Sequence, residues 1–194
     1  MSGQFPSAMD TRLAARMRPG STKAAQASRG RGRVPAVHRN VELVVADLTA
    51  RGADPARVAR LRVLPDAVTT AAAAAAALGV EVGQIANSLV FDADGAPLLV
   101  MTSGAHRVDT GKVAAIVGAT AVRRAAPEFV RTATGQAIGG VAPVGHPAPV
   151  RTLVDRMLAT FDEVWAAAGI PHAVFPSTCA ELVMVTGGEL ADVG

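Results

Sequence analysis

Apolar residues recur along the chain with two different periods, and the period separates predicted helices from predicted strands. Residues 40–50 place their apolar side chains at helical spacing, and Gly52 is positioned to end that helix. A run of alanines follows Thr69 and Thr70; alanine has the highest helix propensity, and either threonine can cap the helix. This alanine helix should pack tightly against a sheet. The same criteria predict helices at 40–50, 71–77, 109–117, 127–134 and 177–186, with Asp109 capping the third, Pro127 opening the fourth and Ser177 opening the last.

Shorter apolar runs predict the strands. Residues 85–91 and 97–102 flank Asp92-Ala-Asp-Gly95, and an Asp-Gly pair between two apolar runs is a strong hairpin signal. Further strands are predicted at 60–64, 121–123, 150–154, 163–167 and 172–175. Helices interleaved with hairpin-linked strands indicate an α+β domain built on a mixed β-sheet.

Charge is unevenly distributed along the chain. The isoelectric point near 10.0 is typical of nucleic-acid binders. However, the first 40 residues hold eight Lys or Arg against one acid, whereas the remaining 154 hold eleven basic and fifteen acidic residues. Residues 1–36 also carry few large apolar side chains, so we predict a disordered basic tail there and one folded domain at 37–194. The tail is either an electrostatic arm for RNA or an inert extension.

Composition also limits the expected cellular location of the protein and the cofactors that it is expected to bind. Cys179 is the only cysteine, and no apolar run is long enough for a signal peptide or a membrane span. We therefore expect a cytoplasmic protein with no membrane partner. The four histidines lack the spacing of metal ligands, so we expect no metal and no other cofactor. Tyrosine is absent and Trp165 is the only tryptophan, which argues against a platform for stacking bases.

Two segments carry a family resemblance: Gly83-Gln-Ile-Ala-Asn-Ser-Leu-Val-Phe91 and Gly139-Gly-Val-Ala-Pro-Val-Gly145. In this order they resemble the YbaK/EbsC family, which includes the bacterial prolyl-tRNA editing domain, and the similarity extends from about Val41 to Val193. The resemblance implies a mixed, strongly curved β-sheet surrounded by helices. It also implies an aminoacyl-tRNA deacylase, which hydrolyses the ester at the tRNA 3′ end when a small residue such as alanine or cysteine is attached to the wrong tRNA.

The family's G-x-x-x-P loop falls on residues 139–143. Glycine lets the backbone approach a ligand, and exposed N–H groups can stabilise an ester oxyanion. A tight turn between two elements needs glycine and proline equally, so that reading stays open. As the family implies, we expect Gly140 to be catalytic and the rest of the loop to bind substrate, namely Gly139, Val141, Ala142 and Pro143.

Asn87 is the main departure from the family, whose deacylases carry lysine at this strand position. Asparagine can donate and accept hydrogen bonds but supplies no charge. We expect Asn87 to position the substrate in catalysis, with Ser88 beside it and His172, next to a late strand, as substrate-binding residues. His172 could equally be a surface histidine.

Three functions remain compatible with these residues. The first is a trans-acting deacylase with water as nucleophile, whose partner is the aminoacyl-tRNA 3′ end and whose basic tail can reach the tRNA backbone. The second is a module that binds aminoacyl-tRNA, or a small aminoacyl ligand, without cleaving it. The third is an activity on a small aminoacyl or nucleotide compound without tRNA. The oligomeric state is left open by the sequence.

Overall fold

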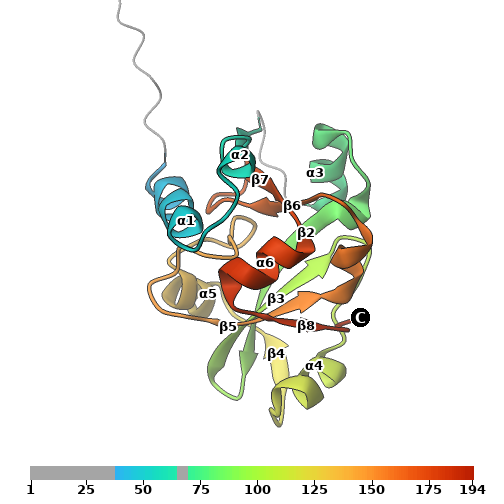
Figure 1. Ribbon diagram of the computed structural model, residues 1–194. Helices are drawn as coiled ribbons and strands as arrows, with labels where there is room; N and C mark the ends of the chain where they lie inside the picture. Colours follow the sequence, from blue (N-terminus) through green and yellow to red (C-terminus); the bar gives the residue numbers. More distant parts are fainter. Residues whose placement is uncertain (1–37, 65–69) are drawn as a thin grey trace, which may run out of the picture. The chain divides into compact units, whose positions relative to one another are not determined.

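The computed structural model describes residues 38–64 and 70–194, which belong to one compact unit (Figure 1). The predicted disordered tail at 1–36 lies outside the described residues, as does Thr69, one of the two candidate helix caps. Within the described residues, no helix is long and apolar enough to cross a membrane.

The strands form one mixed sheet, which confirms the predicted α+β architecture. Its order is β1-β7-β6-β2-β3-β5-β8, and β4 pairs with β2 beside this path. The pairs β2·β3, β2·β4, β6·β7 and β1·β7 are antiparallel, whereas β2·β6, β3·β5 and β5·β8 are parallel. The strand bounds are β1 Arg62–Val63, β2 Ile85–Ala93, β3 Ala96–Ser103, β4 Val122–Arg124, β5 Arg151–Asp155, β6 Val164–Ala167, β7 Ala173–Ser177 and β8 Glu189–Ala191.

Helices surround the sheet, and their caps follow the sequence closely. Thr70 caps the alanine helix through its hydroxyl, Asp109 caps the next, and Pro127 opens the one after that. The α-helices are α1 Arg39–Ala50, α2 Pro55–Val58, α3 Ala71–Leu78, α4 Thr110–Val117, α5 Pro127–Thr134 and α6 Cys179–Thr186, and the 3-10 helices are η1 Val82–Gln84 and η2 Arg156–Thr160.

The prediction that Ser177 opens the last helix is wrong. Ser177 is the final residue of β7, and its hydroxyl donates to the Glu181 carboxylate at 2.7 Å. The helix instead begins at Cys179, because the Thr178 hydroxyl accepts the Glu181 amide at 3.1 Å. The elements α2, η1, η2 and β8 were not predicted, and each is only three to five residues long.

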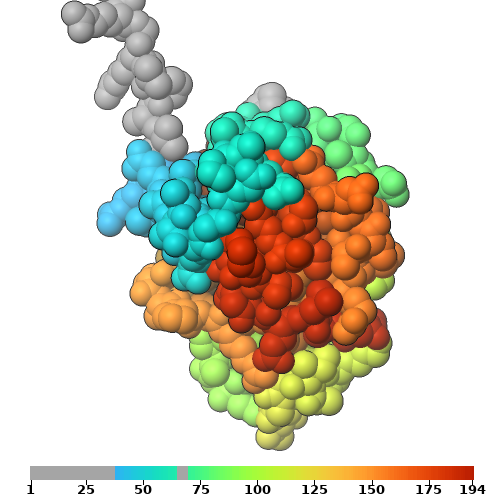
Figure 2. Space-filling model, in the orientation of Figure 1, coloured from blue at the N-terminus to red at the C-terminus, as the bar shows by residue number. Residues whose placement is uncertain are grey.

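The main core lies between the sheet and the helices α1 and α6. Val44 and Leu48 of α1 and Leu182 of α6 are fully buried in it. Figures 1 and 2 show α6 crossing the middle of one face, with α1 and α2 beside it. A second, smaller hydrophobic cluster contains Ala74 and Ala75 of α3 together with residues of β2, β6 and β7. This confirms that the alanine helix packs closely on the sheet.

The β2·β3 hairpin is the longest pairing in the sheet. It turns through Asp94 and Gly95, whose φ angles of 51° and 89° suit a tight two-residue turn between twisted strands. The Asp94 carboxylate also accepts the amides of Thr120 and Ala121 at 2.6 and 3.0 Å, which ties the turn to the start of β4. These hydrogen bonds lower the pKa of Asp94. The hairpin therefore presents β2 as a fixed element beside the candidate site.

Candidate active site

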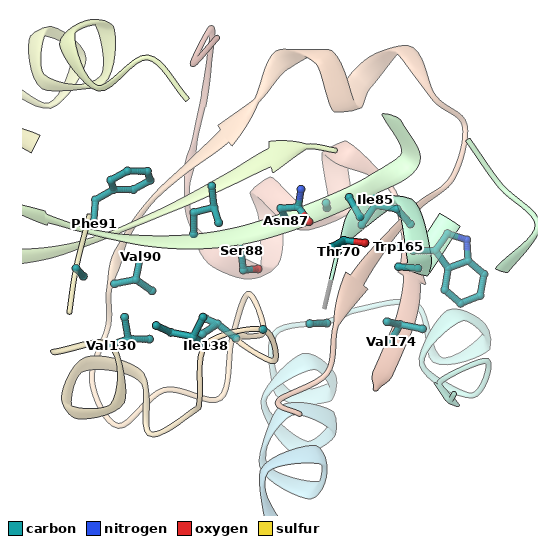
Figure 3. Close-up of a pocket in the computed structure, with 18 of the residues that line it drawn as sticks. Thr70, Ile85, Asn87, Ser88, Val90, Phe91, Val130, Ile138, Trp165 and Val174 are labelled. Carbon is teal, nitrogen blue, oxygen red and sulfur yellow. The ribbon is translucent and has the colours of Figure 1, made fainter. Parts of the chain in front are cut away.

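A cavity of about 260 Å³ lies along β2 (Figure 3). Every residue of β2 from Ile85 to Phe91 contributes to its lining. The remaining walls come from the start of α3, the end of β4, α5, β6, β7 and the glycine loop. Their lining residues are Thr70, Ala71, Ala74, Arg124, Ala125, Val130, Ile138, Gly139, Val141, Trp165, Ala167 and Val174. The volume falls near the lower limit of about 300 Å³ for sites that bind small molecules. The cavity therefore suits a small ligand.

Asn87 and Ser88 both line this cavity, and both are half-buried. In Figure 3 the Ser88 side chain points toward the side of β2 occupied by Ile138, whereas the Asn87 side chain points to the other side. Within the described residues, the Asn87 side chain makes no hydrogen bond, and the Ser88 hydroxyl is buried without a partner. Strand alternation thus places Asn87, predicted to be catalytic, and Ser88, predicted to bind substrate, on opposite sides of β2.

Two residues of the glycine loop that line the cavity, Gly139 and Val141, have amides without a hydrogen-bond partner among the described residues, whereas the Gly140 amide is bonded. The Gly140 amide donates to the Ala137 carbonyl at 3.0 Å. The amides of Gly139 and Val141, in contrast, make no hydrogen bond within the described part of the chain. Gly139 has a φ of 86°, a left-handed conformation that favours glycine. Gly139 and Val141 are thus the cavity-lining loop residues whose amides remain available to a ligand, within the described part of the chain.

Gly140 has a packing role. A Cβ on this residue would lie 2.5 Å from the carbonyl carbon of Ile170 and 2.6 Å from the nitrogen of Pro171. Real Cβ atoms do not approach a backbone so closely. The loop therefore needs glycine at position 140 to lie against the turn before β7.

Gln136 holds the loop together from within, and sequence reasoning missed it. Its side chain is 2% exposed, and its Oε1 accepts the Ala142 amide at 2.6 Å. Its Nε2 donates to the Val144 carbonyl at 3.3 Å. A polar residue directly before a glycine-rich segment was the available signal, because buried amides and carbonyls in an irregular loop need side-chain partners.

His146 and Asp47 provide two more anchors. Nε2 of His146 lies 2.9 Å from the Ala142 carbonyl, and the Asp47 carboxylate accepts the Gly145 amide at 2.8 Å. Burial lowers the pKa of His146, although the Ala142 carbonyl and Asp47 act in the opposite direction. Burial alone would raise the pKa of Asp47, but hydrogen bonds from Arg51 and from the Gly145 amide hold it below its usual value. The neutral histidine thus donates to Ala142 through Nε2.

The other predicted site residues lie outside this cavity. Pro143 lines a second cavity of about 720 Å³ between α1 and the segment 143–150. Ala142 is fully buried and lines neither cavity. His172 is half-buried just before β7, where its carbonyl accepts the Leu64 amide at 2.7 Å. The structure therefore brings together Asn87, Ser88, Gly139 and Val141.

Charged groups are nearly absent from the cavity. Among the described residues that line it, Arg124 is the only ionisable side chain, and no carboxylate lies within 4 Å of its guanidinium. Lys112, the only lysine in the described ranges, lies elsewhere and binds Asp192 at 3.2 Å and the Gly194 carbonyl. In residues 38–64 and 70–194, no three His, Cys, Asp or Glu side chains are grouped as metal ligands would be. Chemistry here would rest on neutral hydrogen-bonding groups.

Comparisons with known proteins agree with this geometry. Residues 65–184 match the family model of the aminoacyl-tRNA editing domain. The uncharacterised protein YwhH of Bacillus subtilis is 33% identical over 110 residues, which cover 56% of this chain and 69% of that protein. The proline–tRNA ligase of Geobacillus kaustophilus is 28% identical over 120 residues, or 62% of this chain, and the match spans about a fifth of the ligase.

A solved structure extends the similarity to three dimensions. It is described as a candidate trans-editing enzyme for prolyl-tRNA synthetase, and it is 41% identical to this chain with a TM-score of 0.74. The match covers 81% of this chain and 98% of that structure. Both β2 and the glycine loop lie within residues 65–184, the range that matches the family model.

Proposed function

The chain belongs to the aminoacyl-tRNA editing domain family, the YbaK-like family, and on this premise we propose that it is a deacylase acting in trans on mischarged tRNA. One observation carries the proposal. Gly139 and Val141, whose amides have no partner among the described residues, line a small cavity together with the strand of Asn87. A small aminoacyl ester in this cavity would place its carbonyl oxygen next to backbone donors, which is the arrangement that stabilises a tetrahedral oxyanion.

The proposed reaction is hydrolysis of the ester between the amino acid and the ribose. A water oxygen forms a bond to the ester carbon while the loop amides stabilise the negative charge on the carbonyl oxygen. The bond from that carbon to the ribose oxygen then breaks. The ribose oxygen takes a proton that originates from the water, and the amino acid leaves as a carboxylate after losing its remaining acidic proton to solvent. Among the described residues, the cavity lining supplies no general base, so we assign the proton relay to the neighbouring ribose hydroxyl.

Asn87 and Arg124 would hold the substrate in place. The Asn87 amide is free of hydrogen bonds within the described residues, but its side chain points to the side of β2 opposite Ile138, so it would bind a part of the substrate on that side and not the ester beside the loop. Arg124 lines the cavity, is exposed and has no carboxylate partner among residues 38–64 and 70–194, so it can contact a phosphate of the tRNA 3′ end. A cytoplasmic location, where charged tRNA occurs, is part of the same proposal.

A second function follows from the residue at position 87. Without a lysine there, the pocket can bind aminoacyl-tRNA and leave the ester intact. The scarcity of ionisable side chains among the described lining residues favours this alternative, because Arg124 is the one of them that carries a full charge.

Deacylation of a panel of mischarged tRNAs, including alanyl- and cysteinyl-tRNA for proline, tests both proposals. Wild-type protein should hydrolyse at least one substrate above the uncatalysed rate, and Gly139→Ala should reduce turnover. Gly118→Ala is the matched control, because Gly118 ends α4 with a φ of 72° and has open space around it. Turnover only in Asn87→Lys would identify a binding module with an intact pocket. No turnover in either protein would overturn the deacylase.

A further inference from the structure

One edge of β2 has a gap in its strand pairing. On its β3 side, every residue from Ala86 to Ala93 has a partner. On its other side, β6 pairs only with Ile85 and Ala86, and β4 pairs only with Phe91 to Ala93. Within the parts of the chain that the structure describes, the stretch 87–90 therefore has no partner strand on this edge.

The hydrogen bonds show which main-chain groups face the gap. The Gly104 amide donates to the Ile85 carbonyl at 2.8 Å, so odd-numbered residues of β2 bond toward β3. The Ala125 amide donates to the Val90 carbonyl at 3.4 Å, so even-numbered residues bond toward the other edge. Backbone groups of successive strand residues point to opposite edges. The Ser88 carbonyl and the Val90 amide therefore point into the gap.

The gap coincides with the candidate active site. A strand that offers one face to a cavity contributes every second residue, because side chains alternate. Here all seven residues from Ile85 to Phe91 line the cavity, so the strand presents its edge. The rest of the lining includes Ala125 from the β4 side and Ala167 from the β6 side, the two elements that border the gap. The glycine loop lies alongside the same stretch in Figure 3, where Ile138 is near Val90.

We propose that this open edge recognises the α-amino group of the aminoacyl substrate, with the Ser88 carbonyl as its main-chain acceptor. The inference rests on the deacylase or binding function proposed above, because it concerns the same cavity. A charged ammonium donating to a carbonyl forms a strong hydrogen bond. Asn87, next to this carbonyl, adds no charge that would compete with the ammonium for it.

Two consequences follow for substrate choice. Recognition through the main chain is independent of the substrate side chain, so several small aminoacyl groups share it. An N-acylated substrate loses the positive charge of its amine and all but one of the N–H donors. Its acyl group must also fit against the edge of β2. The site therefore selects aminoacyl esters with a free amine and excludes N-blocked esters such as peptidyl-tRNA.

Binding of stable analogues tests the inference without relying on catalysis. The probes are adenosine carrying an amide-linked 3′-alanyl group, its N-acetyl derivative, and the lactyl analogue, in which a hydroxyl replaces the amine. Calorimetry on the full chain should show at least about tenfold weaker binding of the last two, which corresponds to about 1.4 kcal/mol. The amide signal of Leu89 should shift on saturation, because its nitrogen shares a peptide group with the Ser88 carbonyl.

A variant that alters the main chain of β2 provides a second test of the inference. Val90→Pro removes the amide in the gap and places the proline ring there, while the hydrogen bonds to β3 remain because they belong to odd-numbered residues. It should abolish binding of the alanyl probe and retain the wild-type circular dichroism spectrum. If this variant misfolds, the probe series and the Leu89 amide signal, both measured on the wild-type protein, still test the inference.

The outcomes separate this inference from the proposed function. Equal affinity for the N-acetyl probe, an unmoved Leu89 signal, or no binding of any probe at millimolar concentration would overturn it. Full-rate hydrolysis of N-acetylalanyl-tRNA would also overturn it and leave the deacylase standing. Amine-dependent binding without hydrolysis of any tRNA would support it and refute the deacylase.

Discussion

The side-chain oxygen of Gln136 accepts the amide of Ala142 at 2.6 Å, and this buried contact braces the glycine loop across six residues. The same side chain donates to the Val144 carbonyl, so one residue satisfies both a donor and an acceptor of the loop. Gln136 does not line the cavity that holds Gly139 and Val141. The geometry of the proposed oxyanion donors therefore depends on a residue outside that cavity.

Replacing Gln136 with leucine should destabilise the protein by about 1–3 kcal/mol, because a buried amide and a buried carbonyl lose their partners. Urea unfolding followed by circular dichroism measures the change. The control is Glu128→Gln, an exposed residue on the adjacent helix α5, which should stay within about 0.5 kcal/mol of wild type. Equal stability of the leucine variant and wild type would show that the loop does not depend on this contact.

His146 should make stability depend on pH. Burial lowers its pKa below the usual 6.5, so the unfolded chain binds a proton more readily than the folded chain. Stability is then fully present above pH 6.5 and declines as the pH falls through the folded-state pKa. In His146→Gln the amide can still donate to the Ala142 carbonyl but does not titrate. Urea midpoints between pH 7.5 and 5 should therefore fall more steeply for wild type, and parallel profiles would contradict this account.

Sequence reasoning located most elements because their signals were local. Thr70, Asp109 and Pro127 define helix starts through their own side chains, and Asp94-Gly95 defines the hairpin through its own backbone. Ser177 and Thr178 were harder to separate, since both can cap a helix. A carboxylate four residues ahead, that of Glu181, binds the Ser177 hydroxyl and leaves Thr178 as the cap.

The candidate site was only partly predictable, because it depends on contacts between distant segments. The motifs identified β2 and the glycine loop, and the structure places Asn87, Ser88, Gly139 and Val141 around one cavity. The sequence could not show that the Gly140 amide is already bonded within the loop. The gap in the pairing of β2 was equally hidden, because it depends on where β4 and β6 end along that strand.

Gly140 and Gly118 should respond differently to the same substitution. Gly140→Ala places a methyl group 2.5 Å from the Ile170 backbone, and such overpacking typically costs about 1–3 kcal/mol or more. Gly118→Ala meets no atom within 4 Å but keeps a φ of 72°, which costs an alanine about 1–2 kcal/mol. Gly140→Ala should be the less stable of the two in urea unfolding, and it should also disturb amide signals of the turn at Ile170. The reverse order of stability would mean that the turn at Ile170 shifts to accommodate the methyl group without lowering the free energy of unfolding.

Ser88→Ala should leave the stability of the protein unchanged or raise it. The Ser88 hydroxyl is buried without a hydrogen-bond partner among the described residues, so the folded state bears the cost of taking it out of water. Removing the oxygen relieves a cost of about 1–3 kcal/mol, and part of this gain is offset because the alanine leaves a small void. Urea midpoints of the two proteins measure the difference, and Ser177→Ala is the contrasting variant, because that hydroxyl is also buried but donates to Glu181 at 2.7 Å. Ser177→Ala should destabilise. If Ser88→Ala destabilised as much, the Ser88 hydroxyl would have to be hydrogen-bonded in solution.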